Sequence, residues 1–274
     1  MAAERRRRIS VWLLILAGIY VVVCMVVFAA QRKLVYFPAR ELTATPADAG
    51  VPFEDVEFSL ADGTKCHGWW LPHPKPIATL IYCHGNGGNI SGRVGILERL
   101  HALSLSIFIF DYPGYGQSGG APTEASIDES ALLAWQHVRE TRQVPSEKIV
   151  LWGRSLGGGV AVTLASRKPC AAVVIESSFL SAPDIGQRAY PFFPVKLLMQ
   201  DRFDSAAKIA QVTVPKLHLH SRSDEVVLYA SGRALFELAP EPKRFVELHG
   251  GHNDPPEATG AEAAAREFLR GLFR

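Results

Sequence analysis

The chain has 274 residues, of which 48% are hydrophobic and 20% charged, so it is long enough to bury one large core. Its 29 basic and 27 acidic residues leave a net charge of +2, and residues 5–8 are four consecutive arginines, so the rest is near neutral and nothing indicates a nucleic-acid surface. The four cysteines are widely spaced and match neither a zinc motif nor a disulfide scaffold.

One apolar segment organises the first part of the chain. Residues 9–30 carry no charged side chain and, as a helix, span about 33 Å, enough to cross a hydrocarbon core of about 30 Å. We therefore expect a basic tail at residues 1–8, a transmembrane helix at 9–30 and a juxtamembrane linker at 31–52, followed by one domain at 53–274. A cleaved signal peptide is the alternative, although such peptides have apolar cores of only about 7–15 residues.

Basic residues on the two flanks predict the orientation of this helix. The arginines at residues 5–8 favour a single-pass protein with its N-terminus in the cytoplasm and its domain exported. Arg32, Lys33 and Arg40 on the other flank nearly balance the four arginines, so the opposite orientation is the alternative.

The domain is predicted to be an α/β fold. Residues 56–60 and 66–71, joined by a turn at Asp62 and Gly63, indicate an antiparallel hairpin. Short apolar runs then alternate with helical patterns, which is typical of a mostly parallel sheet, here of eight strands, covered by helices on both faces. The later strands are expected at residues 79–83, 106–110, 149–152, 172–175, 216–220 and 244–248, and the last helix at 257–273.

Residues 180–215 interrupt this alternation. The stretch follows the sixth strand, contains several prolines and is long for a plain connection. We interpret it as a short lid or pocket wall whose apolar side chains face a substrate. The candidate pocket residues are Phe179, Phe192, Phe193, Leu197 and Leu198.

The strand at residues 149–152 runs into Gly153-Arg154-Ser155-Leu156-Gly157 and then into a helix of small residues. A G-x-S-x-G sequence between a strand and a helix is typical of a sharp turn that holds its serine clear of the sheet. Ser155 is therefore the candidate nucleophile, at the N-terminal end of a helix, where negative charge is favoured. A glycine-rich turn with a solvated serine is the alternative.

A nucleophilic serine needs a base and an acid that orients the base. In a fold with this turn, the acid and then the histidine follow the serine, each after a late strand. Asp224, after the strand at 216–220, is the candidate acid, and His252, after the last strand, is the candidate base. Glu225 and Glu176 remain alternative acids.

The loop after residues 79–83 is rich in glycine and begins with a histidine. Two backbone N–H groups, those of Leu156 and Asn86, are expected to form the oxyanion hole. His84, at the start of the loop, more readily supports the loop than acts as a second base. No Gly-Lys-Ser or Gly-Lys-Thr follows, which excludes a phosphate-binding P-loop.

Two histidines raise the question of a metal. His218 and His220 lie on one face of the strand at 216–220, but no acidic or cysteine cluster accompanies them in the sequence. We therefore expect neither a metal nor another cofactor.

The motifs of the chain, taken in order, resemble those of the α/β-hydrolase superfamily over roughly residues 34–272. These motifs are the loop at residues 84–89, the turn from Gly153 to Gly157, Asp224 and His252. Within the superfamily, the chain is similar to the membrane-anchored bud-emergence-type serine hydrolases, whose eukaryotic members include protein depalmitoylases. The resemblance implies the α/β-hydrolase fold and a serine hydrolase with a triad of Ser155, Asp224 and His252, without fixing the substrate.

We therefore expect a membrane-anchored esterase or thioesterase that forms an acyl-enzyme on a small-molecule or lipid-like substrate. The apolar lid beside a membrane anchor favours an acyl chain. A serine exopeptidase or amidase is one alternative, for which Asp184, Asp201 and Asp204 would bind a terminal amine. A non-catalytic binding module with the same fold is the other.

Overall fold

The computed structural model describes residues 2–254 and 259–273. Its centre is an eight-stranded sheet with the strand order β10-β9-β8-β7-β4-β6-β3-β2, which confirms the predicted number of strands. Strands β2 and β3 form the predicted antiparallel hairpin, β3 and β6 are also antiparallel, and the other neighbours run parallel. The strands are β2 (Glu54–Ser59), β3 (Lys65–Leu71), β4 (Ala78–Cys83), β6 (Leu105–Phe110), β7 (Ile149–Arg154), β8 (Ala172–Glu176), β9 (Lys216–Ser221) and β10 (Lys243–Leu248).

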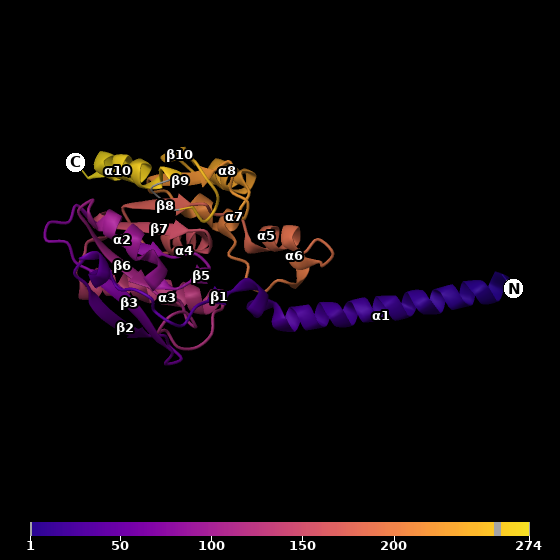
Figure 1. Cartoon of the computed structure of the whole chain (residues 1–274). Helices are drawn as coiled ribbons and strands as arrows, with labels where there is room; N and C mark the ends of the chain where they lie inside the picture. Colours follow the sequence, from indigo (N-terminus) through magenta and orange to yellow (C-terminus); the bar gives the residue numbers. More distant parts are fainter. Residues whose placement is uncertain (1, 255–258, 274) are drawn as a thin grey trace.

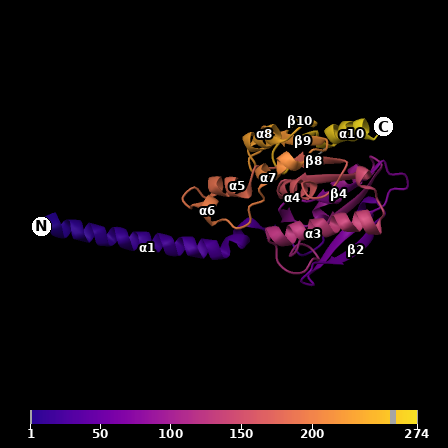
Figure 2. The same cartoon turned by 180° about the vertical axis from the view of Figure 1, so that it is seen from behind.

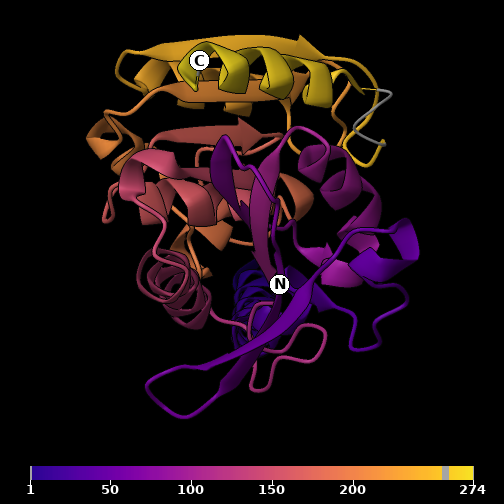
Figure 3. The ribbon, with the colours of Figure 1, turned by 90° about the vertical axis from the view of Figure 1, so that its left-hand side faces the viewer.

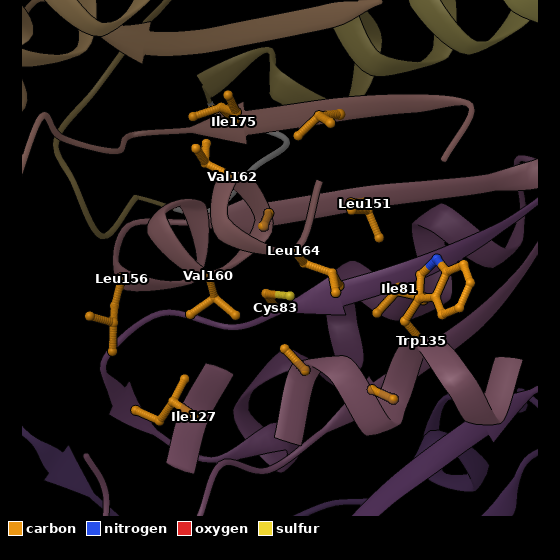
Figure 4. Close-up of a cluster of buried hydrophobic side chains, with 14 of the residues drawn as sticks. Ile81, Cys83, Ile127, Trp135, Leu151, Leu156, Val160, Val162, Leu164 and Ile175 are labelled. Atoms are coloured by element: carbon orange, nitrogen blue, oxygen red, sulfur yellow. The ribbon is translucent and has the colours of Figure 1, made fainter. Parts of the chain in front are cut away.

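Helices cover both faces of the sheet (Figure 3), which is why its central strands are almost continuously apolar and buried. On one face, Ile127 and Trp135 of α3 and Val160 of α4 pack against Ile81 and Leu151 of the sheet (Figure 4). The helices on that face are α3 (Glu124–Gln136), α4 (Leu156–Ala165) and α8 (Tyr229–Leu238), and those on the other are α2 (Val94–His101) and α10 (Ala261–Leu272). The predicted start of the last helix, residue 257, lies outside the described residues.

The N-terminal helix α1 (Ala2–Val35) extends away from the domain (Figures 1 and 2). It contains the whole predicted span at residues 9–30 and is long and apolar enough to cross a membrane. The four arginines of the predicted tail belong to the same helix.

Residues 31–52 differ from the linker expected from the sequence. The helix continues to Val35, and β1 (Phe37–Pro38) then pairs in parallel with β5 (Gly87–Gly88). Leu42 and Val51 pack on the core that α2 and α10 cover. These apolar side chains bind the segment to the domain, so it is a structured part of the domain and not a plain spacer.

The predicted lid at residues 180–215 contains three short α-helices between β8 and β9. They are α5 (Ala182–Ala189), α6 (Val195–Leu198) and α7 (Ser205–Lys208). Residues 182–199, which we call the cap, lie alongside α1 on the side of the domain from which that helix extends, and α7 then returns to the domain (Figure 1).

Candidate active site

Ser155 lies at a strained turn between β7 and α4. Its φ is 53° and its ψ is −119°, a conformation that is costly for a residue with a side chain. Its N–H donates to the carbonyl of Glu176 at 2.8 Å, which helps to hold the turn. A Cβ at Gly153 would overlap the carbonyl oxygen of Gly157, and a Cβ at Gly157 would overlap that of Cys83. Close backbone contacts thus require glycine on both sides of the serine.

A chain of hydrogen bonds joins Ser155 to His252 and Asp224. His252 Nε2 lies 3.1 Å from Ser155 Oγ, and His252 Nδ1 lies 2.8 Å from Asp224 Oδ2. The other carboxylate oxygen, Oδ1, accepts the N–H groups of Val226 at 3.0 Å and Val227 at 2.7 Å. Asp224 follows β9 and His252 follows β10, so parallel strands bring both residues to the edge at which β7 ends.

The electrostatics suit a serine that loses its proton to the histidine. Burial by itself would raise the pKa of Asp224, but the hydrogen bond and charge of His252 and the N–H of Val227 outweigh it, so this pKa lies below its ordinary value. An ionised Asp224 accepts the Nδ1–H of His252, which leaves Nε2 free to accept a proton from Ser155.

The two alternative acids contact other groups. Glu225 Oε2 accepts the backbone N–H of His252 at 3.0 Å and not its ring. Glu176 accepts the indole N–H of Trp152 at 2.9 Å and lies 3.4 Å from Arg154 Nε. Of the three acids that the sequence offered, Asp224 is the one that contacts the imidazole.

Arg154 belongs to the candidate site, although no sequence motif points to it. Its Nη2 donates to the carbonyl oxygen of His252 at 2.6 Å, while its Nε faces Glu176. The guanidinium therefore connects the serine turn to the loop that carries His252. The sequence shows only that an arginine follows an apolar strand, and its position opposite Glu176 becomes visible in the register of β7 and β8.

The loop after β4 lies beside the serine. A Cβ placed on Gly85 would be 3.6 Å from Ser155 Cβ, and Asn86 and Leu156 line the same cavity as Ser155. The side chain of Asn86 is held on both sides, since its Oδ1 accepts the Tyr115 hydroxyl at 2.8 Å and its Nδ2 donates to the carbonyl of Val35 at the end of α1. These bonds fix the Asn86 backbone close to the serine.

An apolar cavity of about 790 Å³ reaches Ser155 and His252. The expected pocket residues Phe179, Phe193 and Leu198 line it. Helix α1 forms a further wall that the sequence did not reveal, because its last turns were assigned to the bilayer or to the linker. The residues of α1 that line the cavity are Val27, Phe28, Gln31, Leu34 and Val35.

Phe192 and Leu197 were wrongly expected in this pocket. They are 86% and 82% exposed, respectively, and point away from the cavity. Phe192 lies in a turn beside Phe193, and of the two only Phe193 lines the cavity. Leu197 lies on the short helix α6, whose inner face is occupied by Val195 and Leu198.

His84 is enclosed behind the loop. Its Nδ1 lies 2.7 Å from the carbonyl oxygen of Gly85, and its ring stacks on Tyr112 with 4.1 Å between centroids. Burial lowers the pKa of His84 to about 3, so the ring is neutral at physiological pH. Asp111 lies 3.6 Å from its Nε2, and burial raises the pKa of this carboxyl to about 7.

The histidines considered for a metal support the sheet and the Asp224 loop. His220 Nε2 donates to the carbonyl of Val227 at 2.8 Å, which fixes the loop that carries Asp224. The ring of His218 packs edge-on against Phe236 at 5.3 Å.

Comparisons with known proteins agree with this arrangement. The family description "alpha/beta hydrolase fold" matches residues 78–214. Protein Rv2307c of Mycobacterium tuberculosis is 35% identical over 252 residues, which cover 90% of each chain. Alpha/beta hydrolase domain-containing protein 17C of Mus musculus is 36% identical over 191 residues, which cover 66% of this chain and 56% of that protein.

The solved structures show the same fold. Pyrococcus furiosus esterase Pf2001 superposes with a TM-score of 0.72 over 88% of this chain and 99% of that one, at 19% identity. An acetyl xylan esterase from Paenibacillus superposes with a TM-score of 0.66 over 89% of this chain and 99% of that one, also at 19% identity. The chain therefore belongs to the α/β-hydrolase family, as the order of its motifs predicted.

Proposed function

We propose that this chain is a membrane-anchored serine hydrolase that cleaves carboxylic ester or thioester bonds. The observation that carries the proposal is the hydrogen-bonded chain of Ser155, His252 and Asp224 at one end of an apolar cavity. Membership of the α/β-hydrolase family and the fold shared with esterases support the hydrolysis of esters.

In this mechanism, Ser155 Oγ attacks the carbonyl carbon while His252 Nε2 accepts the hydroxyl proton. The N–H groups of Leu156 and Asn86 stabilise the tetrahedral oxyanion, and Leu156 does so at the positive end of α4. His252 then gives its proton to the departing alcohol or thiol, which leaves an acyl-enzyme on Ser155. Water, deprotonated by the same imidazole, hydrolyses that intermediate and releases the acid.

The cavity favours an acyl chain as the substrate group. Its volume of about 790 Å³ lies in the range of small-molecule sites, and most of its wall is apolar. The three acids that would bind the amine of a peptide have other partners. Asp184 lies 2.6 Å from Lys196 Nζ, Asp201 accepts a backbone N–H of α3 at 3.0 Å, and Asp204 caps α7 at 3.0 Å. None of these three acids lines the cavity, which favours an esterase over an exopeptidase.

A fluorophosphonate probe and a series of p-nitrophenyl esters test this function. We expect the full-length protein in mild detergent to be labelled and to hydrolyse the esters, with both activities lost in Ser155→Ala and retained in the control Ser146→Ala. Activity should rise from the acetyl to longer chains. Folded protein that reacts with neither reagent would indicate a binding module, and hydrolysis restricted to acetyl esters would exclude an acyl-chain substrate.

We further propose that α1 is the membrane anchor of the domain, which we expected at residues 53–274 and which the packed segment before residue 53 extends, and that the arginines at residues 5–8 stay in the cytoplasm. The absence of charge from residues 9–30 supports the anchor, and the arginine cluster supports the orientation. A C-terminal reporter that is active only outside the cytoplasm should be active. Activity of a cytoplasm-only reporter at the same position would reverse the orientation.

A further inference from the structure

The tip of the cap lies against the middle of α1. The Tyr20 hydroxyl donates to the carbonyl oxygen of Phe192 at 2.8 Å, and the Tyr20 and Phe193 rings stack with 6.4 Å between centroids and 13° between planes. In two opposite views, α5 and α6 lie alongside this helix (Figures 1 and 2).

A second set of contacts fixes the base of the cap to the end of α1. Gln31 Nε2 donates to the carbonyl of Leu198 at 3.4 Å, and Gln31 Oε1 accepts the N–H of Gln200 at 2.8 Å. Arg32 Nε lies 3.4 Å from Asp201 Oδ2. At about 1.5 Å per residue, the contacts from Tyr20 to Gln31 extend over about 16 Å of helix, so the cap lies along α1.

This placement determines the depth of the cap. Tyr20 is near the centre of the apolar run at residues 9–30, so a bilayer that covers the run also covers the tip of the cap. The tip exposes the large apolar side chains that such a position requires, since Phe192 is 86% and Leu197 82% exposed. In water these two side chains would be an unfavourable surface.

The cations of the cap are compatible with this depth. Lys196 Nζ is paired with Asp184 at 2.6 Å, which reduces the cost of a charge in an apolar medium. Arg188 is exposed near the end of α5, and its long side chain can extend towards the headgroups.

The same two elements form the walls of the cavity. Val27 and Phe28 of α1 line it together with Ile185, Phe193 and Met199 of the cap. We propose that the cap is a second membrane-inserted element and that an acyl chain enters the cavity from the bilayer between α1 and the cap. The substrate is then a bilayer-resident ester or thioester. This inference rests on the proposed hydrolase function for its catalytic part, whereas insertion of the cap does not depend on catalysis.

Insertion is tested with a fluorophore at the tip of the cap. The variant Leu197→Cys, labelled with the environment-sensitive dye NBD, is reconstituted at full length in phosphatidylcholine vesicles. All four native cysteines are buried, and labelled wild type measures their background. Glu147→Cys is the matched control, because Glu147 is exposed just before β7, at the opposite end of that strand from Ser155.

We expect the dye at residue 197 to shift to the blue and to be quenched by doxyl-labelled lipid, and the dye at residue 147 to behave as in water. Equal, water-like signals at both positions would overturn the insertion of the cap.

Substrate entry is tested with Phe192→Glu/Leu197→Glu in the same vesicles. Neither residue lines the cavity, so hydrolysis of a soluble p-nitrophenyl butyrate should stay within about twofold of wild type. Hydrolysis of a long-chain ester dissolved in the bilayer should fall at least about tenfold, because two charges disfavour insertion. An equal rate on the bilayer ester would refute entry from the membrane. Wild type that hydrolyses neither ester would instead refute the proposed function.

Discussion

At the scale of single residues, Arg154 provides a test of how the site is held in place. Its guanidinium donates to the carbonyl of His252 at 2.6 Å, so Arg154→Met removes a support of the histidine loop and retains an apolar stem. We expect kcat for a short ester to fall by about 10- to 100-fold with little change in KM, because small errors in position are costly in catalysis. Steady-state kinetics across pH measures this effect.

Arg154→Lys keeps a donor and should recover part of the lost kcat. Glu176→Gln is the matched control, because Glu176 forms the ion pair with Arg154, at 3.4 Å from its Nε. This variant should lower kcat less than Arg154→Met does. A wild-type kcat in Arg154→Met would show that the loop is held by other contacts.

Asp111 should make stability depend on pH. Burial raises its pKa from an ordinary 3.8 to about 7, so between these pH values the folded protein binds a proton that the unfolded chain has released. The contribution of this group to folding therefore declines as pH rises from about 4 to about 7. Asp111→Asn keeps an acceptor for the N–H of Ile90, which donates to Asp111 Oδ1 at 3.0 Å, and cannot ionise.

We expect the free energy of unfolding of Asp111→Asn, relative to wild type, to increase with pH over that interval, by up to about 1 kcal/mol per pH unit. Denaturant unfolding in mild detergent at several pH values measures the difference. Burial of His84 in its neutral form makes stability increase with pH. This effect is common to both proteins, so it cancels in the difference between them. A difference that is constant with pH would mean that Asp111 is ionised in the folded state.

The triad candidates could be chosen from the sequence because each stands at a definite place relative to a strand: Ser155 at the end of one, Asp224 and His252 after two others. Arg154 could not be assigned in this way. Its partner, the carbonyl of His252, is 98 residues away in the chain, and only the folded sheet brings the two groups together.

At the scale of elements, the close contact between α4 and β4 predicts the effect of a single methyl group. A Cβ on Gly157 would overlap the carbonyl oxygen of Cys83, and backbone on both sides cannot move freely. We expect Gly157→Ala to destabilise the protein by at least about 3 kcal/mol and to abolish fluorophosphonate labelling of Ser155.

Gly95→Ala in helix α2 is the matched control. There a Cβ would meet only the flexible end of Arg99, at 3.6 Å. Because alanine favours a helix over glycine, this variant should be neutral or more stable by up to about 1 kcal/mol. Thermal unfolding and probe labelling compare the two, and equal stability would contradict the close contact at Gly157.

The directions of side chains in the cap could not be predicted. Composition correctly indicated an apolar pocket wall. Residues 190–194, however, show no helical or strand periodicity that would tell which of Phe192 and Phe193 faces the cavity. Their difference arises from the contact of Phe193 with Tyr20, on a helix far away in the sequence. The short pairing of β1 with β5 was missed for the same reason, since two residues a strand leave no pattern.

At the scale of the whole molecule, α1 has two parts whose removal should have different effects. Deleting residues 2–24 removes much of the apolar run and the contact at Tyr20, but keeps Val27, Phe28 and Leu34 in the cavity wall. Deleting residues 2–35 also removes that wall. We expect the variant without residues 2–24 to be found outside the membrane fraction and to keep its preference for long acyl chains in detergent. The variant without residues 2–35 should lose that preference.

Ratios of kcat/KM for octanoyl and butyryl p-nitrophenyl esters measure the preference, with circular dichroism to compare folding. Identical ratios in the two variants would show that α1 contributes nothing to the pocket. The sequence predicted the anchor from composition alone, whereas its role as a wall depends on how the helix is oriented against the cap, which composition does not encode.

The bond between Asn86 and the last carbonyl of α1 also bears on how the protein is made. Its two partners are separated by 51 residues, and the helix leaves the ribosome first. When the loop at residues 84–89 is translated, the end of α1 that will hold it already exists. The loop can therefore reach its final conformation only after both segments have been made, and the order of synthesis delivers the end of α1 first.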